Sequence, residues 1–195
     1  MGIIETLIGK LYDDLKPLVI KGFKAITDKD KCDPNTFISK EFNFLISWPK
    51  GWVGDKEIGE NMRKQLGFPI TVSFPISILS EKLLPGFRPN VNVVVENVGD
   101  INIKSYMAQS LNILRVSGME VLNSHIDDHF NSATLELRRM SPLGVSIFQV
   151  QKSFIHNGKA YTITISELKP EFMEKEPQLV HEIKEIVQSF SFLGK

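Results

Sequence analysis

The sequence predicts an α+β fold, in which helices cover both faces of a central antiparallel β-sheet and an extra amphipathic helix precedes it. Three observations predict this class. A valine-rich stretch at 90–98 leads into a helical pattern, four strand-like stretches follow one another between 120 and 168, and an amphipathic segment ends the chain. Consecutive strands joined by short turns form antiparallel sheets, and apolar helix faces must pack against such sheets.

The stretch NVNVVVENV, at 90–98, is the segment around which the rest of the chain is organised. Its valines favour a buried strand, because β-branched side chains lose little rotamer freedom on a pleated surface. Gly99-Asp100 then indicates a turn, and Ser105 is expected to cap a helix. The apolar face of that helix consists of Tyr106, Met107, Leu111 and Leu114. The glycine fingerprints that cradle phosphates are absent, so this is interpreted as a structural crossover.

An amphipathic helix is predicted over residues 3–27, and Pro17 is expected to kink it. Five of its apolar residues are spaced 4-3-4-3, like the seam of a coiled coil, and are candidate partner-binding residues. They are Ile4, Ile8, Leu11, Leu15 and Leu18. Three interpretations stay open: packing on its own domain, pairing with a second copy of the chain or another protein, and binding at a membrane surface. The mixed charges of the polar side disfavour the membrane.

The segment TDKDKCDP, at 27–34, is predicted to be a linker. It separates an N-terminal region, 1–30, from a domain at 35–195. Residues 37–48 alternate as a single strand, with Phe42, Phe44 and Ile46 on one face. The glycine-punctuated stretch at 54–67 is predicted to be a loop. A strand at 70–78 follows, which Pro69 and Pro75 place at an edge or interrupt.

Four strands are expected at 120–127, 133–140, 146–156 and 159–168. In the second, Ala133, Leu135 and Leu137 are expected to face inward, and the alternate residues Thr134, Glu136 and Arg138 outward. Asn157-Gly158 is a strong hairpin signal, because a type I′ turn needs positive φ at both central positions. The last helix is predicted to open near Glu176-Pro177, since proline is tolerated in a first helical turn.

Five stretches follow one another in a recognisable order: FNFLISWPKGW (42–52), NVNVVVENV (90–98), SYMAQSL (105–111), KAYTITIS (159–166) and EIKEIVQSFSF (182–192). Their order resembles the PsbP-like superfamily, with its DcrB-like relatives and the Ran-binding Mog proteins. The resemblance covers about residues 37–193 and leaves the N-terminal helix outside. It implies a central antiparallel sheet with helices on both faces, and a non-enzymatic binding domain.

The formal net charge is zero, which gives no electrostatic footprint for nucleic acid. No uncharged apolar run reaches the roughly 20 residues that span a bilayer. No signal peptide is recognised at the start, so a cytoplasmic location is expected if the chain is full length and is unknown if an export signal was removed. Met1-Gly2 with Thr6 matches the pattern of an N-myristoylation signal. The single cysteine, Cys32, cannot form a disulfide within the chain.

The segment HIDDH, at 125–129, is the sharpest candidate for chemistry. On a strand, His125, Asp127 and His129 would project from one face, and two imidazoles with a carboxylate suit a divalent transition metal. The alternative is a polar hairpin tip, because DDHFNS is good turn composition. No cofactor is expected apart from such a metal ion.

Catalytic signals are weak. There is no GxSxG elbow, and Cys32 lies in a charged segment without a nearby histidine. The leading hypothesis is a non-enzymatic protein-binding or scaffold module, which associates with a protein partner or with itself through the N-terminal helix. A divalent-metal-binding accessory protein and an unrecognised enzyme are the alternatives.

Overall fold

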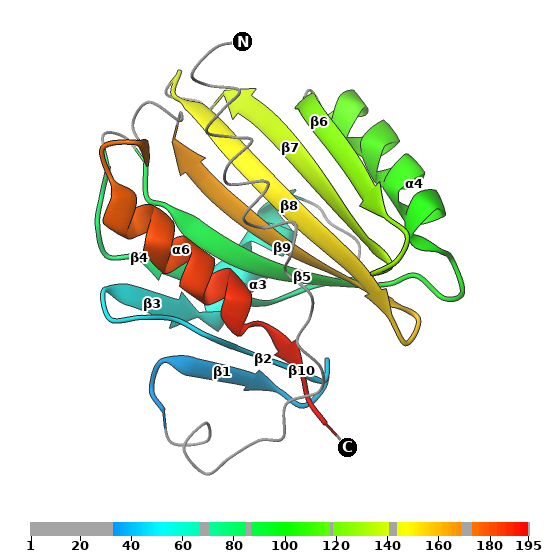
Figure 1. Cartoon of the computed structure of the whole chain (residues 1–195), viewed down its shortest axis with the longest axis horizontal. Helices are drawn as coiled ribbons and strands as arrows, with labels where there is room; N and C mark the ends of the chain where they lie inside the picture. The colour runs from blue at the N-terminus through cyan, green and yellow to red at the C-terminus, as the bar shows by residue number, and fades with distance from the viewer. Residues whose placement is uncertain are drawn as a thin grey trace. The chain divides into compact units, whose positions relative to one another are not determined.

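The computed structural model describes residues 33–66, 71–84, 87–117, 119–140, 144–168 and 173–194 (Figure 1). The predicted helix at 3–27, and with it the five seam residues, lies outside these ranges. The chain divides into two compact units, one made of Met1–Gly54 with Lys169–Lys195 and the other of Asp55–Leu168. Within the described ranges, no helix is both long and apolar enough to cross a membrane.

The smaller unit, which contains both ends of the chain, has a sheet with the strand order β1-β2-β10. Its strands are β1 (Thr36–Ser39), β2 (Phe44–Ser47) and β10 (Ser191–Phe192), all paired antiparallel. The helix α6 (Pro177–Ser189) packs against β2. The Ser189 hydroxyl accepts a hydrogen bond from Ser47 N at 2.8 Å and donates to Ser47 O at 2.9 Å, which fixes the end of α6 on the strand.

Two predictions for this unit have different outcomes. The single strand expected at 37–48 is wrong, because the chain reverses between β1 and β2 and Asn43 takes a positive φ of 56°. The C-terminal helix is confirmed, and it begins at Pro177. The strand β3 (Trp52–Asp55) comes after β2 in the sequence. The indole Nε1 of its Trp52 donates to Glu182 Oε2 at 2.8 Å.

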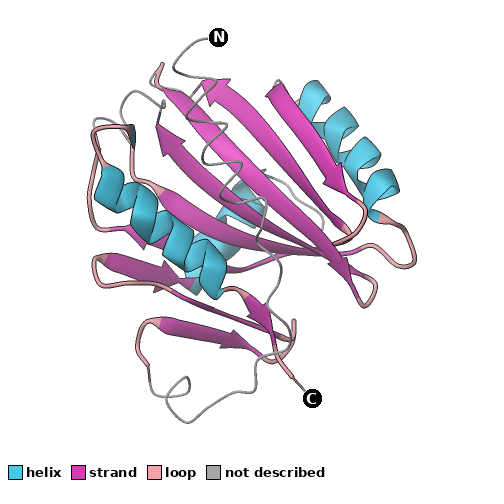
Figure 2. Cartoon of the chain, viewed as in Figure 1, coloured by secondary structure: helices cyan, strands magenta, loops and turns pink. Residues whose placement is uncertain are grey.

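The larger unit is built mainly from strands (Figure 2). In this unit the strand order is β4-β5-β9-β8-β7-β6, and every neighbouring pair is antiparallel. The strands are β4 (Val72–Ser80), β5 (Asn90–Asn97), β6 (Glu120–Asp127), β7 (Ser132–Met140), β8 (Ser146–His156) and β9 (Lys159–Leu168). The five strands predicted from residue 90 onward are therefore confirmed, as is the α+β class. The expectation that helices cover both faces of one sheet stays a prediction.

The turns of the larger unit follow the glycine and proline signals. Asn157 and Gly158 have φ values of 49° and 71°, as the hairpin between β8 and β9 requires. Gly99 has a φ of 64° in the turn after β5. In β4 the pairing with β5 shifts between Ser73 and Ile76, where Pro75 interrupts the ladder.

Two helices of this unit correct the sequence analysis. The expected loop at 54–67 is wrong, because α3 (Lys56–Leu66) occupies it and packs against β4. Gly59 permits this packing, since a Cβ there would lie 2.6 Å from the Cβ of Phe74. The helix α4 (Ile103–Val116) begins earlier than expected, because Asn102 and not Ser105 is its N-cap. The Asn102 side chain accepts the backbone N–H of Ser105 at 2.9 Å.

The two faces of this sheet differ in composition. On one face, Ile103 and Met107 of α4 pack on the inward residues predicted for β7, namely Ala133, Leu135 and Leu137. The opposite face of the central strands is apolar and nearly inaccessible to solvent. It includes Val91, Val93, Val95, Ile163 and Ile165, each at most 2% exposed.

Candidate functional site

The structure places the predicted metal-binding residues on β6 and in the turn that follows it. His125 and Asp127 share one face of the strand, because they pair with Thr134 and Ser132 of β7. The strand ends at Asp127, so His129 lies in the turn and not on the strand. Only His125 and Asp127 therefore lie on the extended backbone that would align the three side chains.

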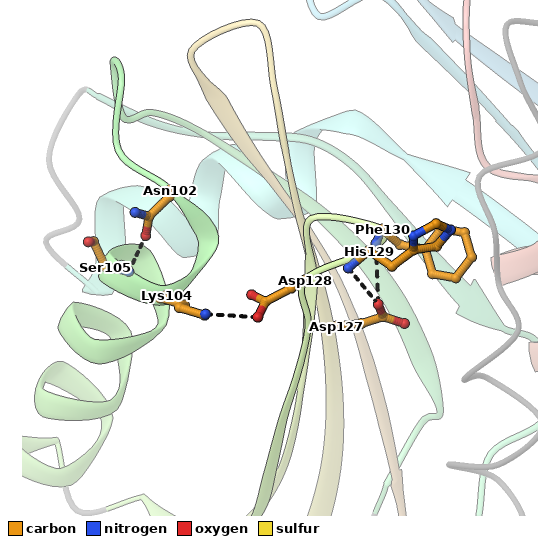
Figure 3. Close-up of polar contacts among 7 residues, drawn as sticks. All are labelled: Asn102, Lys104, Ser105, Asp127, Asp128, His129 and Phe130. Atoms are coloured by element: carbon orange, nitrogen blue, oxygen red, sulfur yellow. Dashed lines mark hydrogen bonds and ion pairs between the residues drawn. The ribbon is translucent and has the colours of Figure 1, made fainter.

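The Asp127 carboxylate organises this turn (Figure 3). Its Oδ1 accepts the backbone N–H of His129 at 3.1 Å and that of Phe130 at 3.2 Å. Such a bond from an aspartate to the backbone two residues on defines an Asx turn. The described ranges contain no group of three or more His, Cys, Asp or Glu side chains placed to hold a metal ion. Metal binding at His125, Asp127 and His129 stays a prediction.

Further contacts hold the turn to its neighbours. Asp128 forms an ion pair with Lys104, in the first turn of α4, with 2.8 Å between Oδ2 and Nζ (Figure 3). Asn131 takes a positive φ of 46° and donates from Nδ2 to the carbonyl of Ile155 at 3.2 Å. The turn is therefore tied both to the helix and to β8.

This fixed turn presents an aromatic side chain to solvent. Phe130 is 42% exposed. Its ring packs edge to face against the imidazole ring of His129, with 4.6 Å between the two ring centroids. The adjoining strand β6 lies at the edge of the sheet. Its four consecutive residues from Leu122 to His125 are exposed. We call β6 together with residues 128–130 the edge surface.

A lysine that the sequence analysis missed lies beside the edge surface. Lys152 pairs with Thr134, the residue opposite His125, and is only 5% exposed. Burial lowers the pKa of Lys152 to about 8, while the negative charge of Asp127 acts in the opposite direction. Its Nζ lies 5.6 Å from the ring centroid of Phe154. The sequence does contain a signal for this lysine. It occupies an alternate position of the strand, on the same face as the apolar residues Phe148, Val150 and Phe154.

Two buried carboxyl groups lie on the same face of the sheet as Lys152. Burial raises the pKa of Glu136 above its usual value, and a hydrogen bond with the Asn123 side chain offsets part of this rise. Glu136 and Thr134 were expected to face outward, and they do point away from α4, but both are buried. Burial also raises the pKa of Glu167 to about 8. The Glu167 carboxyl has no hydrogen bond or ion pair with any described residue.

Comparison with models of known protein families gives no match, and no curated protein matches the sequence. Solved structures do match. The solution structure of cyanobacterial PsbP (CyanoP) from Synechocystis sp. PCC 6803 superposes with a TM-score of 0.53 at 15% sequence identity, over 80% of this chain and 91% of that chain. The chain has a PsbP-like fold.

Two further solved structures give lower scores. LpqN, involved in cell envelope biogenesis of Mycobacterium tuberculosis, has a TM-score of 0.50 at 12% identity, over 88% of this chain and 99% of that chain. The Ran-binding protein Mog1p of Saccharomyces cerevisiae has a TM-score of 0.49 at 11% identity, over 83% of this chain and 96% of that chain. The PsbP-like fold confirms the resemblance found in the sequence. At these identities the likeness concerns the fold alone.

Proposed function

We propose that this chain is a non-enzymatic protein-binding module and that its partner docks on the edge surface. One observation carries the proposal. The turn that carries Phe130 is held by the Asp127 carboxylate, by the Lys104–Asp128 ion pair and by Asn131, so the backbone that displays the aromatic side chain is fixed. Aromatic side chains that need no ordering on binding are favoured as interface anchors.

The strand beside this anchor supports the proposal. Within the described ranges, β6 is the outermost strand of its sheet, and the outer edge of such a strand offers backbone N–H and C=O groups to a strand of another protein. Its pairing with β7 shifts between Val121 and Asn123, which distorts the first part of the edge. The regular part therefore runs from Asn123 to Asp127 and leads directly to Phe130.

Photo-crosslinking in cells of the source organism tests this proposal. A benzoylphenylalanine is placed at Phe130 and, as a matched control, at Leu83, a large apolar side chain that is also exposed. We expect a discrete adduct from position 130 and none from position 83. A Ser124→Lys substitution on the exposed side of β6 is expected to reduce the adduct, because lysine on an edge strand opposes strand addition.

The mass of the adduct identifies the partner class. An adduct with a different protein supports the proposal, and an adduct of twice the chain mass would assign the edge surface to self-association. Equal adducts from both positions, or none from position 130, would contradict it. The N-terminal seam residues remain a separate prediction of where a partner binds.

A further inference from the structure

The strand register defines one end of the larger sheet. It brings together the end of β4, the start of β5 and the end of β9, because Leu79 pairs with Asn90 and Asn90 with Ser166. The start of β8 lies beside the ends of β9 and β7. Glu120, at the start of β6, pairs with Arg138 near the end of β7. The chain passes from α4 into β6, so the last turn of α4 lies at this end as well (Figure 1).

Large apolar side chains that solvent reaches gather at this end. In the described part of the chain, the four most exposed are Leu83 (71%), Ile113 (66%), Val116 (91%) and Met140 (63%). Leu83 follows β4, Ile113 and Val116 belong to the last turn of α4, and Met140 ends β7. Single exposed apolar side chains are ordinary, but several at one place indicate an interaction surface.

Three exposed arginines accompany these apolar residues. Arg88 precedes β5, Arg115 lies in the last turn of α4, and Arg139 lies near the end of β7. Their guanidinium groups have no hydrogen bond or ion pair with a described residue. The helix end does not need Arg115, because the backbone N–H groups of Ser117 and Met119 already donate to carbonyls of its last turn. We call the three arginines and the four apolar residues the basic end.

Each arginine of the basic end has an apolar side chain beside it. Arg115 is followed by Val116, and Arg139 by Met140. Leu83 and Arg88 flank a small hairpin in which the backbones of Leu84 and Phe87 exchange hydrogen bonds of 2.9 and 3.0 Å. The same combination of a cationic and an apolar group therefore occurs at three places along the strand ends.

Charge is separated along this sheet, although the formal net charge of the chain is zero. The exposed charged residues at or beside the basic end are Lys82, Arg88, Arg115, Arg138 and Arg139 against Glu81 and Glu120. Glu120 is already paired with Arg138, at 2.6 and 2.8 Å. Burial raises the pKa of Glu167 to about 8, which keeps it mostly uncharged at neutral pH. Around the opposite end, Asp100, Asp127 and Asp128 outnumber Lys104 and Lys159.

We propose that the basic end docks on an anionic lipid surface. Guanidinium groups bind phosphate oxygens in pairs, and an anionic leaflet attracts basic side chains. Apolar side chains beside them enter the boundary between the headgroups and the acyl chains. The strand ends from β4 to β6 extend over about 24 Å, at about 4.8 Å between neighbours. A fluid lipid surface takes in such separated side chains one by one, whereas a protein would need a surface that matches them.

This orientation leaves the edge surface accessible to a protein partner. Phe130 follows β6, whereas the basic end lies where β6 begins, so the two are at opposite ends of that strand. Lipid docking is therefore independent of the protein-binding role proposed above and compatible with it.

Flotation of the full chain with lipid vesicles tests the proposal. Vesicles of phosphatidylcholine alone are compared with vesicles of phosphatidylcholine and phosphatidylglycerol, in a ratio of about two to one. We expect binding to the second kind only, weakened by added salt. Arg115→Gln and Arg139→Gln are each expected to lower the partition coefficient about fivefold. Val116→Ser is expected to lower it at every salt concentration, because it removes an apolar contribution.

Lys104→Gln is the matched control, since it removes the same charge from an exposed side chain at the opposite end of the sheet. It is expected to leave the partition coefficient unchanged. The thermal midpoint of each variant shows that it is folded. Equal binding to both kinds of vesicle, an equal loss in Lys104→Gln, or full binding by the Arg115→Gln, Arg139→Gln double variant would overturn the proposal. Equally tight binding to poly-glutamate, insensitive to Val116→Ser, would overturn it in favour of an acidic protein.

Discussion

Lys104 and Asp128 join two elements that are separate in the sequence, with 2.8 Å between Nζ of the first and Oδ2 of the second. The pair connects the start of α4 to the turn after β6 (Figure 3). Both side chains are more than 60% exposed, so water screens their attraction. The neighbouring Asp127 accepts hydrogen bonds from the backbone instead. We therefore expect Asp127 to stabilise the fold more than Asp128 does.

Asp127→Ala is expected to lower the free energy of unfolding by about 1–2 kcal/mol, because two backbone N–H groups lose their acceptor. Asp127→Asn keeps a side-chain oxygen and should lose less. Lys104→Ala should cost less than about 1 kcal/mol. Chemical denaturation measures all three, and equal losses for Asp127→Ala and Lys104→Ala would contradict the ranking. If the turn presents the anchor, Asp127→Ala should also weaken crosslinking from position 130.

Two buried groups with opposite pKa shifts predict a minimum of stability near pH 8. Glu167 has a pKa raised from 4.5 to about 8, so the folded state keeps a proton that the unfolded state loses between those values. Stability from this group is complete below pH 4.5 and is lost as pH rises to about 8. Lys152 has a pKa lowered from 10.5 to about 8, so its contribution is complete above pH 10.5 and is lost as pH falls to about 8.

Urea denaturation across this pH range measures the effect. Glu167→Gln should flatten the acidic limb of the profile and leave the alkaline limb, and Lys152→Met should do the reverse. A wild-type profile without a minimum, or variants that change the wrong limb, would show that these two groups do not dominate the linkage.

Metal binding at the predicted histidines is tested by thermal unfolding with Zn²⁺, Mn²⁺ and Ca²⁺. A ligand that binds only the folded state raises the midpoint. Because Asp127 Oδ1 already accepts two backbone N–H groups, and His129 lies beyond the end of β6, we expect no rise. A rise that disappears in the His125→Ala, His129→Ala double variant would establish the metal site that the sequence predicts.

Gly59→Ala is expected to destabilise the larger unit although alanine favours helices. The added Cβ would lie 2.6 Å from the Cβ and 2.7 Å from the carbonyl oxygen of Phe74, so α3 would have to move away from β4. Overpacking of this kind costs about 1–3 kcal/mol. Asn61→Ala, at an exposed position of the same helix, is the control and should stabilise slightly. A stabilising Gly59→Ala would show that the helix yields easily.

Deletion of residues 1–30 is expected to leave the rest of the chain folded and to change its assembly, if the seam residues pair with a second copy. Light scattering and circular dichroism of the full chain and the truncated chain measure both properties. A lower thermal midpoint of the truncated chain, with no change in the number of chains per particle, would instead favour packing of the helix on its own domain.

The strands after residue 90 could be predicted because each carries its own period-two pattern and ends at a turn signal. Asn157-Gly158 and Gly99 both have the positive φ that their residue types favour. The helix α3 was missed because Gly54 and Gly59 were interpreted as loop signals. Gly59 is required by a close approach to Phe74, a residue fifteen positions away, and local sequence carries no trace of that contact.

The candidate site was predicted in part. Asp127 and His125 were named correctly as neighbours on one face, but the end of β6 and the Asx turn could not be read from composition that suits both a strand and a turn.

The pairing of β5 with β9 constrains synthesis of the chain on the ribosome. Asn90 pairs with Ser166 and Asn97 with Lys159, so the valine-rich strand has no partner on that side until β9 has been translated. Until then its uncharged run of valines exposes a strand edge that favours aggregation. The hairpins β6–β7, β7–β8 and β8–β9 pair strands that are consecutive in the sequence, so each can form as soon as it emerges. A pause in translation before residue 159 would therefore prolong the most aggregation-prone state of the nascent chain.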